Sequence, residues 1–259
     1  MASLRAGWRI QNRVIKALLI RELTTRFGRE NIGFLWMMVE PLLFAVLVGI
    51  MWNILGNTEH GLNVTAFVVT GYLPLTLFRH AVSRSVKAFS ANGSLLYHRQ
   101  IKILDFILVR FAIETIGTMM AYAFIGTVLY AINIFPMPAH VEYLISGWVL
   151  YCLFTLSLCL ILAPASEYSD ALEKFIPVST YIMIPFSGTF NMMSWLSPQL
   201  RDILYWSPPV NAMEMMRYGV FGDRVTPYYN PVVPLAALIV VLPIGLTLCR
   251  RIRRTLVVE

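Results

Sequence analysis

Long runs of apolar residues alternate with short polar segments along most of the 259-residue chain. Several runs approach the ~20 residues that an α-helix needs to cross ~30 Å of hydrocarbon. A lipid-exposed backbone must satisfy its own hydrogen bonds, so each run is predicted to be helical. The fifth run is the least regular, because it contains Pro177 and Pro185. Six membrane-spanning helices are predicted, at about 34–55, 64–82, 106–134, 142–164, 174–193 and 227–249.

The composition supports this all-α integral membrane fold. Hydrophobic residues make up 58% of the chain and charged residues 14%, whereas a soluble domain holds about 25% charged residues. Too few charges remain to cover a water-exposed surface of this size.

Basic residues predict the orientation of the six spans. Lys and Arg gather mainly in an N-terminal segment (1–33), in 83–105 and in a C-terminal tail (250–259), and are absent from 56–63 and 135–141. Cytoplasmic segments carry the excess of Lys and Arg, so both termini are predicted to be cytoplasmic, around a transmembrane domain at 34–249. This distribution explains the net charge of +7, and no nucleic-acid partner is expected.

The N-terminal segment combines its charge with an apolar stripe. Trp8, Ile15, Leu19, Leu23 and Phe27 keep near-helical spacing among basic residues. This pattern predicts an amphipathic helix lying in the membrane interface. The alternative is a plain basic anchor that only sets the topology.

Two further segments are neither spans nor short loops. Segment 83–105 predicts a cytoplasmic helix–turn–helix that breaks at Asn92-Gly93, since both residues tolerate turns; a solvated loop is the alternative. Segment 191–226 is rich in proline and aromatic residues. It predicts two short re-entrant helices that dip into the outer leaflet and break at 207–209.

The sequence contains no recognisable catalytic or metal-binding motif. GxxxxGK[ST], GxSxG, HExxH and CxxC are all absent, and the four histidines are scattered. No enzymatic activity, bound cofactor or metal site is therefore predicted. Charges inside the apolar runs are costly. Arg110 and Glu114, at i and i+4, are expected either to snorkel to the interface or to pair, and Glu40 lies just inside the first run.

The stretch Leu18–Phe44 resembles the beginning of the ABC-2 class polysaccharide-export permeases, in the capsular-polysaccharide branch. Weaker similarity continues almost to the end of the chain. The motifs that carry the resemblance are Arg21-Glu22, Phe27-Gly28-Arg29, Gly33-Phe34-Leu35-Trp36, Glu40-Pro41, Trp206-Ser207-Pro208 and Glu214-Met215-Met216-Arg217.

The resemblance implies the membrane subunit of an ABC transporter in the bacterial inner membrane. Two copies of the chain would form a channel, and two copies of a separate ATPase subunit would bind ATP and Mg. The cargo would be a lipid-linked anionic capsular polysaccharide, passed on to a periplasmic co-polymerase and an outer-membrane export protein. Export of O-antigen, teichoic acid or a small molecule is the alternative, as is a membrane glycosyltransferase.

Three groups of candidate site residues follow. The contact to the ATPase is expected at Asn92, Leu95, Leu96, His98 and Arg99. The lipid-linked substrate is expected to enter at Arg26, Arg29, Trp36 and Glu40, since arginine binds phosphate and carboxylate through two parallel hydrogen bonds; a purely topogenic role for both arginines is the alternative. The re-entrant region and channel are expected to include Trp195, Tyr205, Trp206, Glu214, Arg217 and Tyr218.

Overall fold

The computed structural model describes residues 4–28, 32–55, 61–96 and 100–256, and these contain α-helices and short 3-10 helices but no β-strand. The all-α prediction is confirmed for this part of the chain. The α-helices are α1 (Leu4–Phe27), α2 (Ile32–Leu55), α3 (Val64–Ser85), α4 (Gly93–Leu96), α5 (Ile103–Ala131), α6 (Val141–Tyr168), α7 (Asp170–Ile182), α8 (Pro198–Tyr205), α9 (Pro208–Phe221) and α10 (Val232–Leu256). The 3-10 helices are η1 (Ser90–Asn92), η2 (Pro185–Ser187), η3 (Met193–Trp195) and η4 (Gly222–Arg224).

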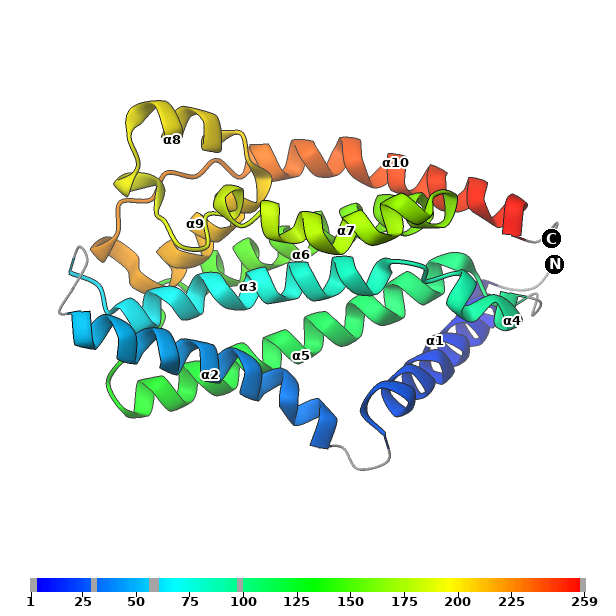
Figure 1. The fold of residues 1–259 in the computed structure, drawn as a ribbon, viewed down its shortest axis with the longest axis horizontal. Helices are drawn as coiled ribbons and strands as arrows, with labels where there is room; N and C mark the ends of the chain where they lie inside the picture. Colours follow the sequence, from blue (N-terminus) through cyan, green and yellow to red (C-terminus); the bar gives the residue numbers. More distant parts are fainter. Residues whose placement is uncertain (1–3, 29–31, 56–60, 97–99, 257–259) are drawn as a thin grey trace.

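The long helices lie side by side along the longest axis of the molecule (Figure 1). The start of α1, the end of α10 and α4 lie at one end of this bundle, which we call the terminal end. Helices α8 and α9 lie at the opposite end, and α1 lies at an angle to the bundle. The two polar segments singled out in the sequence therefore occupy opposite ends.

Five of the predicted spans correspond to α2, α3, α5, α6 and α10, with boundaries that differ by a few residues. Within the described residues, two helices are both long and apolar enough to cross a membrane, Val141–Tyr168 and Val232–Arg253. The six crossings and the orientation stay predictions.

The fifth predicted span differs from the helix in the structure. Helix α7 has 13 residues, from Asp170 to Ile182, and rises only about 20 Å at 1.5 Å per residue. The chain then turns at Pro185 and at Gly188, whose φ of 73° is left-handed. A continuous helix over 174–193 was therefore wrong, because these residues end it.

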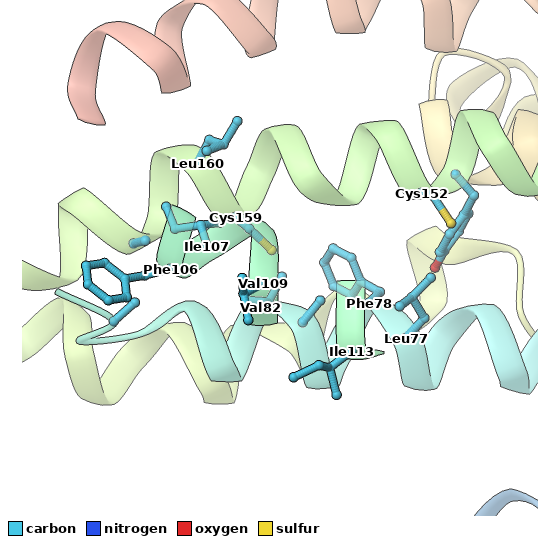
Figure 2. Packing of buried hydrophobic residues seen from close by; sticks show 14 of the residues in the cluster. Leu77, Phe78, Val82, Phe106, Ile107, Val109, Ile113, Cys152, Cys159 and Leu160 are labelled. Carbon is cyan, nitrogen blue, oxygen red and sulfur yellow. The ribbon is translucent and has the colours of Figure 1, made fainter. Parts of the chain in front are cut away.

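The core lies where α3, α5 and α6 meet, as Figure 2 shows. Helix α6 also packs against α9 and α10. A Cβ atom added to Gly147 would lie 2.8 Å from the Ala212 carbonyl oxygen, and one added to Gly219 would lie 2.4 Å from the Leu144 nitrogen. These two glycines allow α6 and α9 to touch along their backbones.

The N-terminal stripe faces the protein over most of its length. Ile15, Leu19, Leu23 and Phe27 pack against the core, whereas Trp8 is 75% exposed. Contacts with α5, including a hydrogen bond from Gln11 to Asp105, hold α1 in place. Its location in a membrane interface stays a prediction.

The break between α3 and α4 differs in position from the prediction. Helix α3 ends at Ser85, Val86 is extended and Lys87 has a φ of 48°. Gly93 instead has helical angles (φ −52°, ψ −43°) and continues η1 into α4. Asn92-Gly93 is therefore not the break, because the chain has already turned at 86–87. The two short helices predicted within 191–226 are present as α8 and α9 and separate at Trp206-Ser207; their re-entry into a membrane stays a prediction.

Candidate functional site

A cluster of charged side chains joins α1, α2, α3 and α5 around one buried carboxylate. Glu114 on α5 is fully buried and pairs with Arg26 on α1. Its carboxylate also lies 3.6 Å from Arg84 Nε and 3.7 Å from His80 Nδ1, both on α3. His80 Nε2 in turn lies 3.9 Å from Glu40 on α2. We call these five residues the Glu114 cluster.

Arg110 and Glu114 do not pair with each other, so this one of the two expected roles was wrong. Arg110 Nε lies 3.2 Å from Glu22 on α1, and its guanidinium donates a hydrogen bond to the Arg84 carbonyl oxygen at 2.7 Å. The helix α1 supplies both Arg26 and Glu22 as oppositely charged partners. Docking of α1 therefore overrides the local i and i+4 pairing on α5.

The structure places two of the four residues predicted to receive the substrate. Arg26 and Glu40 both belong to the Glu114 cluster, with His80 between them and Glu114. Arg29 and the side chain of Trp36 lie outside the described residues. The guanidinium of Arg26 is bound to Glu114, and its role in headgroup binding stays a prediction.

Three residues of the predicted ATPase contact, Asn92, Leu95 and Leu96, lie within residues 86–96, which we call the 86–96 segment; the contact itself stays a prediction. Asn92 is buried, accepts a hydrogen bond from Arg21 at 2.9 Å and donates one to the Ala88 carbonyl oxygen. Leu95 and Leu96 pack partly against the core. Leu95 also lines a groove of about 470 Å³ between α1 and residues 100–101. His98 and Arg99 lie outside the described residues.

Acidic and hydroxyl side chains near the turn between α6 and α7 hold the 86–96 segment, and sequence reasoning missed them. Ser166 Oγ accepts a hydrogen bond from the Lys87 N–H, and Glu167 accepts one each from the Phe89 and Ser90 N–H groups. The Lys87 ammonium donates to Asp170 at 3.3 Å, which raises the pKa of Lys87 above its ordinary value. The available signal in the sequence was the opposite charge of two distant segments, the acidic 167–173 and the basic 83–105.

At the opposite end, Arg217 fills a fully buried position on α9. It donates hydrogen bonds to the carbonyl oxygens of Gly188, Thr189 and Asn191 at 2.5–2.9 Å. Its guanidinium lies 4.0 Å from the centre of the Phe67 ring. Arg217 therefore binds α9 to the 188–191 turn and to α3.

The other residues predicted for the re-entrant region divide between buried and exposed positions. Glu214 is buried and accepts hydrogen bonds from the N–H groups of Met193 and Tyr228. The ring of Trp195 packs on Phe67, and that of Tyr218 stacks on His140. Both of these rings are partly exposed, as is Tyr205, which accepts a hydrogen bond from Asn230. Trp206 is 74% exposed. The structure thus brings Trp195, Glu214 and Arg217 together in one packed wall.

The described residues contain no group of three or more His, Cys, Asp and Glu side chains that could hold a metal ion. Cys152, Cys159 and Cys249 are buried free thiols.

Comparisons with known proteins agree with one another along nearly the whole chain. The sequence is 40% identical over 240 residues to the capsule polysaccharide export inner-membrane protein CtrC of Neisseria meningitidis serogroup B, covering 92% of this chain and 91% of that protein. It is 39% identical over 220 residues to the capsule polysaccharide export inner-membrane protein BexB of Haemophilus influenzae, covering 85% and 83%. The polysialic acid transport protein KpsM of Escherichia coli is 26% identical over 223 residues, 86% of each chain. Residues 13–221 match the family model of the ABC-2 type transporters, and the chain belongs to that family.

Proposed function

We propose that this chain is the membrane permease subunit of an ATP-driven exporter of capsular polysaccharide in the bacterial inner membrane. The observation that carries the proposal is the similarity to CtrC over nine-tenths of both chains. The all-helical bundle and the helices α6 and α10, long and apolar enough to span a bilayer, support it. The chain lacks a Walker A motif, so ATP and Mg would bind to a separate subunit.

A complementation experiment tests this function. Deletion of the corresponding gene from a capsulated strain is expected to remove the surface polysaccharide and to leave polymer inside the cell. Expression of this chain together with its ATPase partner should restore the surface polymer, measured by antibody binding to intact cells. An ATPase partner with its Walker lysine replaced should not restore it. Restored export with that inactive partner would contradict the proposal.

The surrounding assembly follows from the same proposal. Two copies of the chain form the channel, and two ATPase subunits dock at the terminal end, where the 86–96 segment and α1 lie. Both termini and this end face the cytoplasm. The cargo is a lipid-linked anionic polymer, which enters at the Glu114 cluster together with Arg29 and Trp36. It leaves past α8 and α9 towards periplasmic and outer-membrane partners.

The ATPase contact can be tested at Leu95 and Leu96. Replacing both with aspartate should place one charge in the groove beside α1 and a second next to it in the 86–96 segment. A lost apolar contact at an interface can cost ~2 kcal/mol or more. We expect the variant to insert into membranes but to retain little ATPase partner on co-purification.

The matched control carries Leu200→Asp and Ile203→Asp on α8, where both side chains are more than half exposed. This pair adds the same charge at the opposite end and should retain the ATPase partner. Equal loss of the partner in both variants would show a general folding defect rather than a lost contact.

A further inference from the structure

One short stretch of chain, Ser166–Asp170, fastens the 86–96 segment to the turn between α6 and α7. Three of its side chains bind the segment: Ser166 through the Lys87 N–H, Asp170 through the Lys87 ammonium, and Glu167 through two N–H groups. Segment and turn are more than 70 residues apart in the sequence. Their connection therefore depends on these contacts rather than on chain continuity.

Glu167 accepts two of the four hydrogen bonds that make up these connections. One carboxylate oxygen, Oε1, accepts hydrogen bonds from the N–H groups of Phe89 and Ser90, each at 3.1 Å. These donors lie at the start of the helical turn Ser90–Asn92, where backbone N–H groups have no acceptor within the helix. Hydrogen bonds to an ionised acceptor are roughly twice as strong as neutral ones. Since the donors belong to the backbone, the connection depends on the side chain at position 167.

The chain connection between α3 and the rest of the 86–96 segment is poorly suited to transmit a movement. Helix α3 ends at Ser85, and the chain reverses through extended Val86 and left-handed Lys87. The 86–96 segment itself is firmly seated, because Ala88 and Phe89 are fully buried. Glu167 therefore connects a displacement of this segment directly to the end of α6 and the turn into α7.

The neighbour that would respond is α7. Ser169 is extended (φ −152°, ψ 123°) and separates two helices, so it can act as a hinge two residues after Glu167. Helix α7 packs against α3 and α6, and Arg79 of α3 lies over the ring of Tyr181. Helix α7 also carries the exposed side chains of Phe175, Tyr181 and Ile182. A change of backbone angles at Ser169 would rotate α7 together with these exposed side chains.

We propose that Glu167 is a positioning residue that transmits movement of the 86–96 segment to α7. The inference rests on the proposed function, in which ATP hydrolysis by the partner moves this segment. In this role Glu167 acts through the 86–96 segment, so its loss should separate hydrolysis from export.

The test measures polysaccharide exported per ATP hydrolysed in cells and membrane vesicles that contain the complete complex. Glu167→Ala removes the acceptor of two charge-assisted hydrogen bonds, and we expect export per ATP to fall about tenfold while the complex assembles and hydrolyses ATP. Glu167→Gln keeps an oxygen that can accept both N–H groups and should restore most of the coupling. Glu173→Ala is the matched control, because Glu173 lies near the same turn but contacts only the Lys87 ammonium, at 3.7 Å.

A cross-link distinguishes transmission from mere stability. In a variant with Ser90→Cys and Glu167→Cys, oxidation with copper phenanthroline should raise export per ATP towards the wild-type value, and reduction should lower it again. Wild-type coupling in Glu167→Ala, or an equal loss in Glu173→Ala, would overturn the inference. A wild-type complex that exports no polysaccharide would instead refute the proposed function.

Discussion

Cells that make the Glu114→Gln variant are expected to lose most of their surface polysaccharide. The fully buried Glu114 faces Arg26, Arg84 and His80. Glutamine keeps the shape but removes the negative charge, and two arginines then face each other without a counter-ion. Breaking a buried ion pair in this way costs about 3–5 kcal/mol. Because Arg26 is the last basic residue of α1, we expect the end of this helix to detach from α5.

Limited trypsin digestion of membrane vesicles measures this detachment directly. Cleavage at the arginines of α1 should become faster in Glu114→Gln than in the wild-type chain. The control is Glu22→Gln, which affects an ion pair between α1 and α5 at a partly exposed position. Its digestion and export should stay close to wild type. Unchanged protection of α1 in Glu114→Gln would show that apolar packing alone holds the helix.

Replacing Arg217 with methionine is expected to produce the largest loss of stability. Methionine replaces only the aliphatic part of arginine and has no donor, so the carbonyl oxygens of Gly188, Thr189 and Asn191 would lose their partner. Each buried polar group left unsatisfied costs about 1–3 kcal/mol. We expect little folded protein to survive detergent extraction and mild heating, as measured by size-exclusion chromatography of a fluorescent fusion.

Arg201 offers a matched comparison at a more exposed position. It also donates to three carbonyl oxygens, those of Met193, Ser194 and Leu196. Water can reach this partly exposed site and replace the lost donors, so Arg201→Met should cost much less stability than Arg217→Met. A similar loss of stability in both variants would mean that burial of the arginine does not decide how much stability is lost.

The helices could be predicted from the sequence wherever length and apolarity decide them. Helices α2, α3, α5, α6 and α10 lie close to the ranges expected from their apolar runs. The turn at Lys87 could not be predicted, because Asn92-Gly93 is the stronger local turn signal. Contacts from Ser166 and Asp170, which are distant in the sequence, hold Lys87 in its left-handed conformation.

The candidate sites were harder to predict because they depend on pairs that are distant in the sequence. Arg26 and Glu114 are 88 residues apart, and no periodicity connects them. Glu167 lies in an acidic stretch that says little about topology, since Asp and Glu contribute weakly to orientation. The buried position of Glu214 and Arg217 was equally hidden, because a charged helix next to prolines resembles a surface element. Tertiary packing decides all of these positions.

The backbone contact between α6 and α9 also has a consequence for the order of biosynthesis. His140 and Ala139 donate hydrogen bonds to the carbonyl oxygens of Gly219 and Val220, and Gly147 and Gly219 leave no space for a side chain between the helices. The ribosome makes α6 well before α9. The face of α6 around Gly147 must therefore stay open until about 70 further residues have been synthesised. A chaperone or lipid that shields this face has to leave before the last third of the chain can close the bundle.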